Sequence, residues 1–295
     1  MIDKHIISKI EKAISCYLKT REVNEFFDQL PIPMTRAQGI EVLNILKRQL
    51  SHVEKFELGV KLVAKWNKKS RKIGNNLLIG YWKSHPMKAR EFLLKFANDP
   101  DWSKRESAAC VLSSILTHDF DNSLPWFTRL VCDSNSNIRR AVVVAVKYSV
   151  QERIPGRAKI LLDLITPLLA DKTEYVRKNL GAFAIGDGFL RVYPKETLDW
   201  IKHQIINTDL QTRWNLAKIF ASSGGNNSWP QGEVFLKTLA TDERHYVWRA
   251  VSSSLVYLGR KRPDEINVLL KDWQKDPKRK YVAKEALKYL FGKQG

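Results

Sequence analysis

The stretch Asp171-Lys-Thr-Glu-Tyr-Val-Arg-Lys178 is one copy of a pattern that recurs along this chain. In each copy an aspartate is followed by a short polar linker, and then by an apolar residue beside one or two cations. Neighbouring copies start 33 to 38 residues apart, and the others begin at Asp99, Asp133, Asp209, Asp242 and Asp276. A fixed period of this length is typical of proteins built from repeated helix pairs.

Each period contains two stretches with the helical spacing of apolar residues. In the second stretch of one repeat, apolar residues recur at Val176, Leu180, Phe183 and Ala184, which predicts a helix with a buried face. The first stretch predicts a separate short helix over residues 90–97, 124–131, 158–169, 196–206, 232–239 and 265–273. Because the repeated aspartate precedes the second helix, we expect it to cap the unpaired N–H groups of that helix.

We therefore predict an all-α fold, a HEAT-like (armadillo-type) α-solenoid of about six to seven two-helix repeats. Helical periodicity also covers residues 6–17, 39–50 and 53–66, where the aspartate pattern fades. No linker rich in Gly, Ser or Pro separates the two parts. We expect a single domain over residues 1–295, with a cap and degenerate repeats in 1–89 and the HEAT-like repeats in 90–295. Residues 67–72 and 222–230 are the longest expected loops.

The composition favours a polyanionic partner. Fifty Lys and Arg residues against 31 Asp and Glu give a net charge of +19, and the isoelectric point is near 9.8. Such an excess indicates nucleic acid first and an anionic membrane surface second. No apolar run reaches the roughly 18 residues of a membrane span. We therefore expect a soluble, cytoplasmic protein without a membrane partner, associated with the nucleoid if the source is bacterial.

Motifs for several kinds of chemistry are missing from the sequence. It has no phosphate-binding glycine loop, no Cys-x-x-Cys pair, no His-x-x-x-His and no Gly-x-Ser-x-Gly. The six histidines are scattered, which argues against a metal site and against a serine-type triad. We expect no metal and no cofactor, so that any catalysis would use carboxylates, aromatic rings and positive charge.

The cations of the repeated pattern are the candidate DNA-binding residues. They fall in the first turn of successive second helices, where side chains and positive helix ends converge, and phosphate favours both. They are Arg105, Arg139, Arg140, Arg177, Lys178, Arg213, Arg249 and Lys284. The first cation of each pair has two interpretations, a phosphate contact or an internal strut that pairs with the aspartate of the next repeat.

Three tryptophans lie at or near the same helix starts: Trp102, Trp214 and Trp248. A tryptophan beside arginines on a basic surface can stack on a sugar or a base. The alternative for each is packing in the core, where large aromatic side chains are common.

Several of these segments together resemble a known family. The segments are Asp101-Trp-Ser-Lys-Arg-Glu-Ser-Ala-Ala109, Asn137-Ile-Arg-Arg140, and Tyr175-Val-Arg-Lys178 followed by Tyr193-Pro194. In order and spacing they are similar to successive repeats of the HEAT-like DNA alkylation-repair glycosylases, the AlkC/AlkD group. The resemblance is clearest over residues 99–214 and continues more weakly toward the end of the sequence.

The resemblance implies a C-shaped solenoid that holds duplex DNA on a basic concave face and hydrolyses the glycosidic bond of N3- or N7-alkylated purines. The damaged base is already cationic and leaves readily, so the enzyme mainly stabilises an oxocarbenium-like sugar and positions water. By position, Glu106 matches the acid of the family's Asp-Trp-x-x-Arg-Glu segment, and Asp187 lies near the acid that follows its Val-Arg repeat. The chain departs from the family at Val144, where the AlkC-like pattern has a glutamate.

Three functions stay open at the level of sequence. The first is an alkylpurine DNA glycosylase of this group, acting as a monomer. The second is a non-catalytic protein of the same architecture that binds damaged or branched DNA. The third is a HEAT scaffold whose concave face holds an acidic protein.

Overall fold

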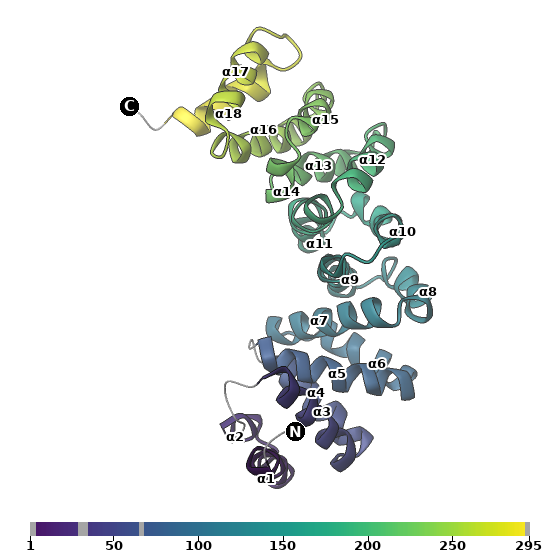
Figure 1. Cartoon of the computed structure of the whole chain (residues 1–295). Helices are drawn as coiled ribbons and strands as arrows, with labels where there is room; N and C mark the ends of the chain where they lie inside the picture. Colours follow the sequence, from purple (N-terminus) through teal and green to yellow (C-terminus); the bar gives the residue numbers. More distant parts are fainter. Residues whose placement is uncertain (1–3, 29–34, 65–67, 293–295) are drawn as a thin grey trace. The chain divides into compact units, whose positions relative to one another are not determined.

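A computed structural model of the chain describes residues 4–28, 35–64 and 68–292, and every regular element in these ranges is helical. The chain divides into two compact units, an N-terminal unit of residues 1–118 and a C-terminal unit of residues 119–295. Figure 1 labels the helices of both units. The all-α class predicted from the sequence is confirmed for the described residues. The observed division falls after His118.

The N-terminal unit is built from consecutive helices. They are α1 (Lys4–Thr20), α2 (Val23–Asp28), α3 (Arg36–Gln49), α4 (His52–Ala64), α5 (Lys68–Ser84), α6 (Pro86–Ala97) and α7 (Trp102–His118). These bounds confirm the helices expected near residues 6–17, 39–50, 53–66 and 90–97, apart from the ends that lie outside the described residues. The loop expected at 67–72 is wrong from Lys68 onward, because α5 begins there and buries Ser70, Ile73 and Leu77 along one face.

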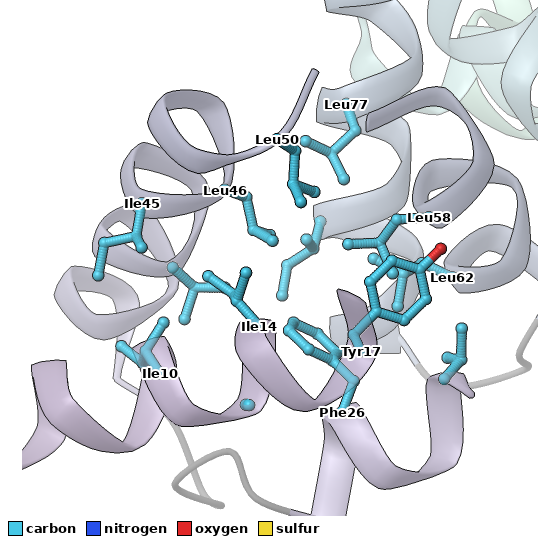
Figure 2. Close-up of a cluster of buried hydrophobic side chains, with 14 residues drawn as sticks. Ile10, Ile14, Tyr17, Phe26, Ile45, Leu46, Leu50, Leu58, Leu62 and Leu77 are labelled. Atoms are coloured by element: carbon cyan, nitrogen blue, oxygen red, sulfur yellow. The ribbon is translucent and has the colours of Figure 1, made fainter. Parts of the chain in front are cut away.

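The core of the N-terminal unit is shown in Figure 2. Ile14 and Tyr17 of α1 meet Phe26 of α2, and the edge of the Tyr17 ring approaches Phe26 with 6.2 Å between ring centroids. Leu46 of α3 and Leu58 of α4 complete the cluster without any exposed surface. Burying such side chains contributes about 1.5–3 kcal/mol each. This apolar core explains why helical periodicity extends to the helices before residue 90, where the repeated aspartate is missing.

The C-terminal unit alternates first and second helices, as the sequence predicted. Its elements are α8 (Phe120–Leu130), α9 (Ser136–Ser149), the 3-10 helix η1 (Val150–Glu152), α10 (Arg157–Ile165), the 3-10 helix η2 (Thr166–Ala170), α11 (Glu174–Asn179), the π-helix η3 (Leu180–Leu190), α12 (Pro194–Gln204), α13 (Leu210–Ile219), α14 (Ser223–Asn227), α15 (Gln231–Leu239), α16 (His245–Gly259), α17 (Pro263–Gln274) and α18 (Lys280–Phe291). The expected loop at 222–230 is wrong in part, since α14 forms within it.

The second helices of the C-terminal unit follow one another in contact. Helix α9 packs on α11 and η3, η3 packs on α13, α13 on α16, and α16 on α18. The apolar run 141–146 of α9 is buried on all sides, as expected for a helix segment that is apolar all round. Equivalent positions of these helices therefore lie next to one another, which decides where a repeated side chain is placed.

The repeated aspartates shape the turns before the second helices. Each accepts a hydrogen bond from the backbone N–H two residues later, and we call these positions turn residues. They are Asp99, Asp133, Asp171, Asp242 and Asp276, joined by Asn207 in the repeat where the sequence pattern selects Asp209. This local pairing is a common alternative of Asp and Asn side chains to a helix cap.

The predicted capping role of these aspartates is therefore wrong in most repeats. The N-cap of α9 is Asn135, two residues after the turn residue, and the N-cap of α11 is Thr173. Only Asp209 among them caps its helix, by accepting the N–H of Thr212 at 2.8 Å. In that repeat Asn207 makes the turn, so the two roles belong to different residues.

Hydropathy gives no sign of a membrane segment in the part of the chain that the structure describes, where no helix combines the length and the apolar character needed to span a bilayer.

Candidate nucleic-acid interface

The residue six positions after each turn residue faces the next repeat, and we call it the strut position. Arg139 occupies it in α9, where Nε and Nη2 donate to the two carboxylate oxygens of Asp171 at 2.6 and 3.2 Å. Its Nη1 also donates to the backbone oxygen of Asp133 at 2.7 Å. The pair is largely buried, with side chains 16% and 6% exposed. Arg139 is thus held as a strut between α9 and the following turn.

Arg213 repeats this arrangement two repeats further along the unit. Its Nε donates to Asp242 at 2.5 Å, and the two side chains are 13% and 6% exposed. Arg244 also donates to the same carboxylate. In the N-terminal unit, Arg105 sits at the strut position of α7 and donates to the backbone oxygens of Asp99 and Pro100. Of the two interpretations of the first cation, the strut describes Arg139 and Arg213.

The two acids of these struts are kept ionised by their partners. Burial acts to raise the pKa of Asp242, but hydrogen bonds from Arg244 and Arg213 outweigh it and bring the pKa to about 2. Burial likewise acts to raise the pKa of Asp171, and the hydrogen bond from Arg139 helps to lower it overall. Both pairs therefore remain charged at neutral pH.

Arg177 holds the strut position of α11 but differs from its equivalents. The next turn residue is Asn207, and Arg177 reaches no carboxylate among the described residues. Its guanidinium lies over the rings of Trp214 and Tyr246, with 5.0 and 5.7 Å to their centroids. Its buried Nε has no hydrogen-bond partner in the described structure, and Nη1 reaches only Gln211 Oε1 at 3.5 Å. The positive charge of Arg177 therefore lies against two aromatic rings instead of a carboxylate.

The residue seven positions after each turn residue lies on the neighbouring face, and we call it the outer position. In the C-terminal unit it is held by Arg140, Lys178, Trp214, Arg249 and the buried Ala283. Arg140 lies over the ring of Tyr175 in the next repeat at 5.3 Å. Trp214 contacts the equivalent Tyr246 by stacking, with centroids 5.7 Å apart and planes at 18°. The recurring contact places the outer positions along one face of consecutive helices.

Two of the outer cations are well exposed. The side chain of Lys178 is 69% exposed and pairs with Glu174 on its own helix, while that of Arg249 is 51% exposed and reaches Glu285 at 3.7 Å. Such solvent-exposed pairs are weak, so an anionic ligand competes with them at little cost. The outer positions therefore provide the cations best placed for phosphate.

Trp248 lies elsewhere. It occupies the strut position of α16, where the arginine of earlier repeats is replaced, and its ring meets His245 edge-on at 4.6 Å. It lines a cavity together with Asp242, Lys278 and Tyr281, and Trp214 is not among the residues that line this cavity. The series of arginines at strut positions ends at this residue.

Two cavities open beside the outer positions of α13 and α16. One has a volume of about 360 Å³ and is lined by Trp214, Tyr246 and His245, among others. The other, of about 500 Å³, has walls that include Tyr257, Arg260 and Tyr289. The residues common to both are Lys218, Arg249 and Ser253. We call the two cavities together the C-terminal groove.

Lys218 was not identified from the sequence, although its position is informative. It lies four residues after Trp214 and therefore shares its helix face. Its ammonium donates to Ser253 Oγ at 2.9 Å, and burial lowers its pKa. Lys218 and Ser253 each lie eleven residues after a turn residue, Asn207 and Asp242. Comparing equivalent positions along the whole second helix, and not only in its first turn, would have shown that the two residues are equivalent and lie on neighbouring helices.

The candidate catalytic residues belong to different units and are described separately. In the N-terminal unit, Trp102 begins α7 with 59% exposure, and Glu106 lies one turn later with partial exposure. In the C-terminal unit, Asp187 lies within η3, and its carboxylate accepts the N–H of Ser223 at 2.7 Å. This bond fixes the start of α14. Val144, where the family pattern has an acid, is completely buried in α9.

Comparison with known proteins leaves the chain without an assigned family. No family model matches the sequence, and no curated protein matches it. A solved structure that it resembles is an engineered protein of the Northeast Structural Genomics Consortium, with 13% sequence identity over 88% of this chain and 100% of that chain. The TM-score of 0.26 is too low to support an argument about fold or function.

Proposed function

We propose that this chain is a HEAT-like α-solenoid that binds duplex DNA and excises N3- or N7-alkylated purines, as its resemblance to the alkylation-repair glycosylases implies. The observation that supports DNA binding is the difference in environment between the strut and outer positions. The strut arginines Arg139 and Arg213 are paired with acids, whereas the outer cations Lys178 and Arg249 are exposed on one face. Cations at three outer positions, Arg140, Lys178 and Arg249, together with a protein charge of +19 suit the negative charge of a DNA backbone.

Base excision would take place at a carboxylate beside an aromatic face. Glu106 and Trp102 provide this pair in the N-terminal unit, since they are one helical turn apart on α7. In the reaction, the bond from C1′ to the purine nitrogen breaks and the neutral alkylated base leaves with the bonding electrons. Water adds to the sugar carbon C1′ and releases one proton to solvent. The negative charge of Glu106 would stabilise the cationic sugar as the bond lengthens. Asp187 is less available, because its carboxylate holds α14.

A second candidate, DNA binding without catalysis, is favoured by two specific observations. Val144 is buried where the family pattern has an acid, and the Asp187 carboxylate already accepts a backbone N–H. The row of outer cations would serve this function equally well.

The binding proposal is tested by fluorescence anisotropy of labelled 20-base-pair duplexes. We expect the protein to bind two duplexes of unrelated sequence with similar affinity, and to lose affinity steeply as salt rises. If neither duplex is bound at 50 mM salt, the DNA-binding proposal is wrong. Binding of an acidic polypeptide under the same conditions would then favour the scaffold interpretation.

The catalytic proposal is tested by measuring release of 3-methyladenine and 7-methylguanine from methylated duplex. The wild-type protein should release base faster than the spontaneous rate, and Glu106→Gln should reduce release to that background. Asp187→Asn serves as the comparison, and its thermal unfolding should be measured beside its activity because α14 depends on Asp187. No release by wild-type protein that binds the duplex would leave the non-catalytic candidate.

A further inference from the structure

The C-terminal groove has the layout of a binding site for a short strand. Its two cavities meet at Lys218, Arg249 and Ser253, which are two cations and a hydroxyl group. On one side of this junction the wall carries Trp214 and Tyr246. On the other side, residues that line the wall of the larger cavity include two further aromatic residues, Tyr257 and Tyr289, together with Arg260. The sequence of features along the groove is therefore aromatic pair, cations, aromatic pair.

This alternation matches the repeating chemistry of a nucleotide strand, in which a charged phosphate separates two flat bases. Aromatic side chains can stack on a base only when its face is accessible, and the bases of a duplex cover one another. The cavity volumes of about 360 and 500 Å³ fall in the range of small-ligand sites. An unpaired segment satisfies both conditions.

We propose that the C-terminal groove binds two consecutive unpaired nucleotides of a DNA strand, with the phosphate between them at Lys218 and Arg249 and one base in each cavity. This inference rests on the proposed DNA-binding function and adds a substrate class to it: duplex DNA with an adjoining single-stranded segment.

The electrostatics of Lys218 support a phosphate at the junction. Its ammonium is partly buried, and its one hydrogen bond shown in the described structure goes to the neutral hydroxyl of Ser253. A desolvated cation gains more from an incoming anion than an exposed one does, because water screens the attraction less. The groove also contains one carboxylate, Glu285, which lies 3.7 Å from Arg249. That carboxylate competes with phosphate for Arg249.

The proposal therefore predicts substitutions with opposite effects. Lys218→Met retains the length of the side chain and removes its charge. It should weaken binding of the unpaired segment roughly tenfold or more, because a charge-assisted hydrogen bond to the phosphate is lost. Tyr289→Ala alters a side chain that is 56% exposed and should weaken binding by a similar factor through lost stacking. Glu285→Gln releases Arg249 and should strengthen binding.

The experiment compares a blunt duplex with the same duplex carrying a ten-nucleotide single-stranded 3′ or 5′ overhang, by fluorescence anisotropy at fixed salt. We expect wild-type protein to prefer one or both overhang forms. Lys218→Met and Tyr289→Ala should remove most of this preference, while their affinity for the blunt duplex should stay within about twofold. Glu285→Gln releases Arg249, which also serves duplex binding, and should strengthen binding of the overhang form at least as much as that of the blunt duplex. The matched control is Lys271→Met, the same change at an exposed residue of α17 that lines neither cavity.

The outcomes separate this inference from the function on which it rests. Equal affinity for blunt and overhang DNA, or a preference that survives both Lys218→Met and Tyr289→Ala, overturns the groove assignment and leaves duplex binding intact. Absence of binding to every DNA form overturns both. Thermal unfolding of each variant distinguishes an effect on DNA binding from an effect on folding. Lys218→Met should be at least as stable as wild type, since it removes a partly buried charge.

Discussion

The strut between Arg213 and Asp242 gives the most quantitative prediction. Asp242 has two roles: one carboxylate oxygen accepts the N–H of Arg244 to form the turn, and the carboxylate also pairs with the guanidinium groups of Arg213 and Arg244. The substitution Asp242→Asn separates them. Asparagine already forms this turn at Asn207, so the variant keeps the turn. It loses the charge together with the second oxygen, which accepts from Arg213 and Arg244.

The magnitude follows from the pKa of Asp242, which is lowered from 3.8 to about 2. Each unit of pKa difference corresponds to about 1.4 kcal/mol, so ionisation of this carboxyl stabilises the folded state by about 2 kcal/mol at pH 7. The side chain is 6% exposed, so solvent screens the pairs only weakly. Because the folded-state pKa is the lower one, this stabilisation is complete well above pH 4 and is lost as the pH falls toward 2.

Urea denaturation of wild type and Asp242→Asn at pH 7, 5 and 3 tests this prediction. The difference in unfolding free energy should be about 2 kcal/mol at pH 7 and 5 and should shrink to about half at pH 3. Asp272→Asn is the matched control, because its carboxylate is 71% exposed and 4.0 Å from Lys275; it should change stability by less than about 0.5 kcal/mol. A difference below about 0.5 kcal/mol for Asp242→Asn, or one that is the same at all three pH values, would refute the reasoning.

Two further predictions concern packing in the C-terminal unit. Val144→Glu, which restores the acid of the family pattern, should destabilise the protein by more than about 3 kcal/mol because it places an unpaired carboxylate in a fully buried site. The same change at Val268, which is 63% exposed, should be nearly neutral in the same urea experiment; equal effects at both sites would contradict the assignment of Val144 to the core. Gly224→Ala should lower the melting temperature, because the added Cβ would lie 2.1 Å from the backbone oxygen of Gly186. Gly80→Ala, where a Cβ meets nothing within 4 Å, should instead stabilise α5 by about 0.5–1 kcal/mol. Calorimetry measures both variants, and equal melting temperatures would show that the contact between η3 and α14 is not tight.

The helices of the repeats were predictable because apolar spacing within a helix is a local property. The pattern correctly placed α9, α13 and α16, and the buried run of α9 followed from its composition. The π-helix η3 was not predictable, since it depends on close contact with α14 at Gly186 and Gly224, residues far apart in sequence. The start of α8 illustrates the same limit: the helix was expected from residue 124 and begins at Phe120, so Pro125 lies inside it.

The candidate site was predictable only in part, for a geometric reason. Sequence places Arg139 and Arg140 side by side, yet one turns toward the acid of the next repeat and the other toward an aromatic ring. The direction of each depends on what the following repeat offers, as Arg177 demonstrates where Asn207 replaces the acid. Lys218 was missed because its importance comes from lying at the junction of two cavities, which no local pattern reveals.

The salt dependence of duplex binding tests the central claim most directly, because it counts phosphate contacts. Wild-type protein should show a steep linear fall of log affinity with log salt concentration. The slope should decrease by about 0.9 for Lys178→Ala and again for Arg249→Ala, and should not change for the exposed Lys271→Ala. Unchanged slopes for Lys178→Ala and Arg249→Ala, or an equal decrease for Lys271→Ala, would contradict the assignment of the outer positions as the DNA-binding face.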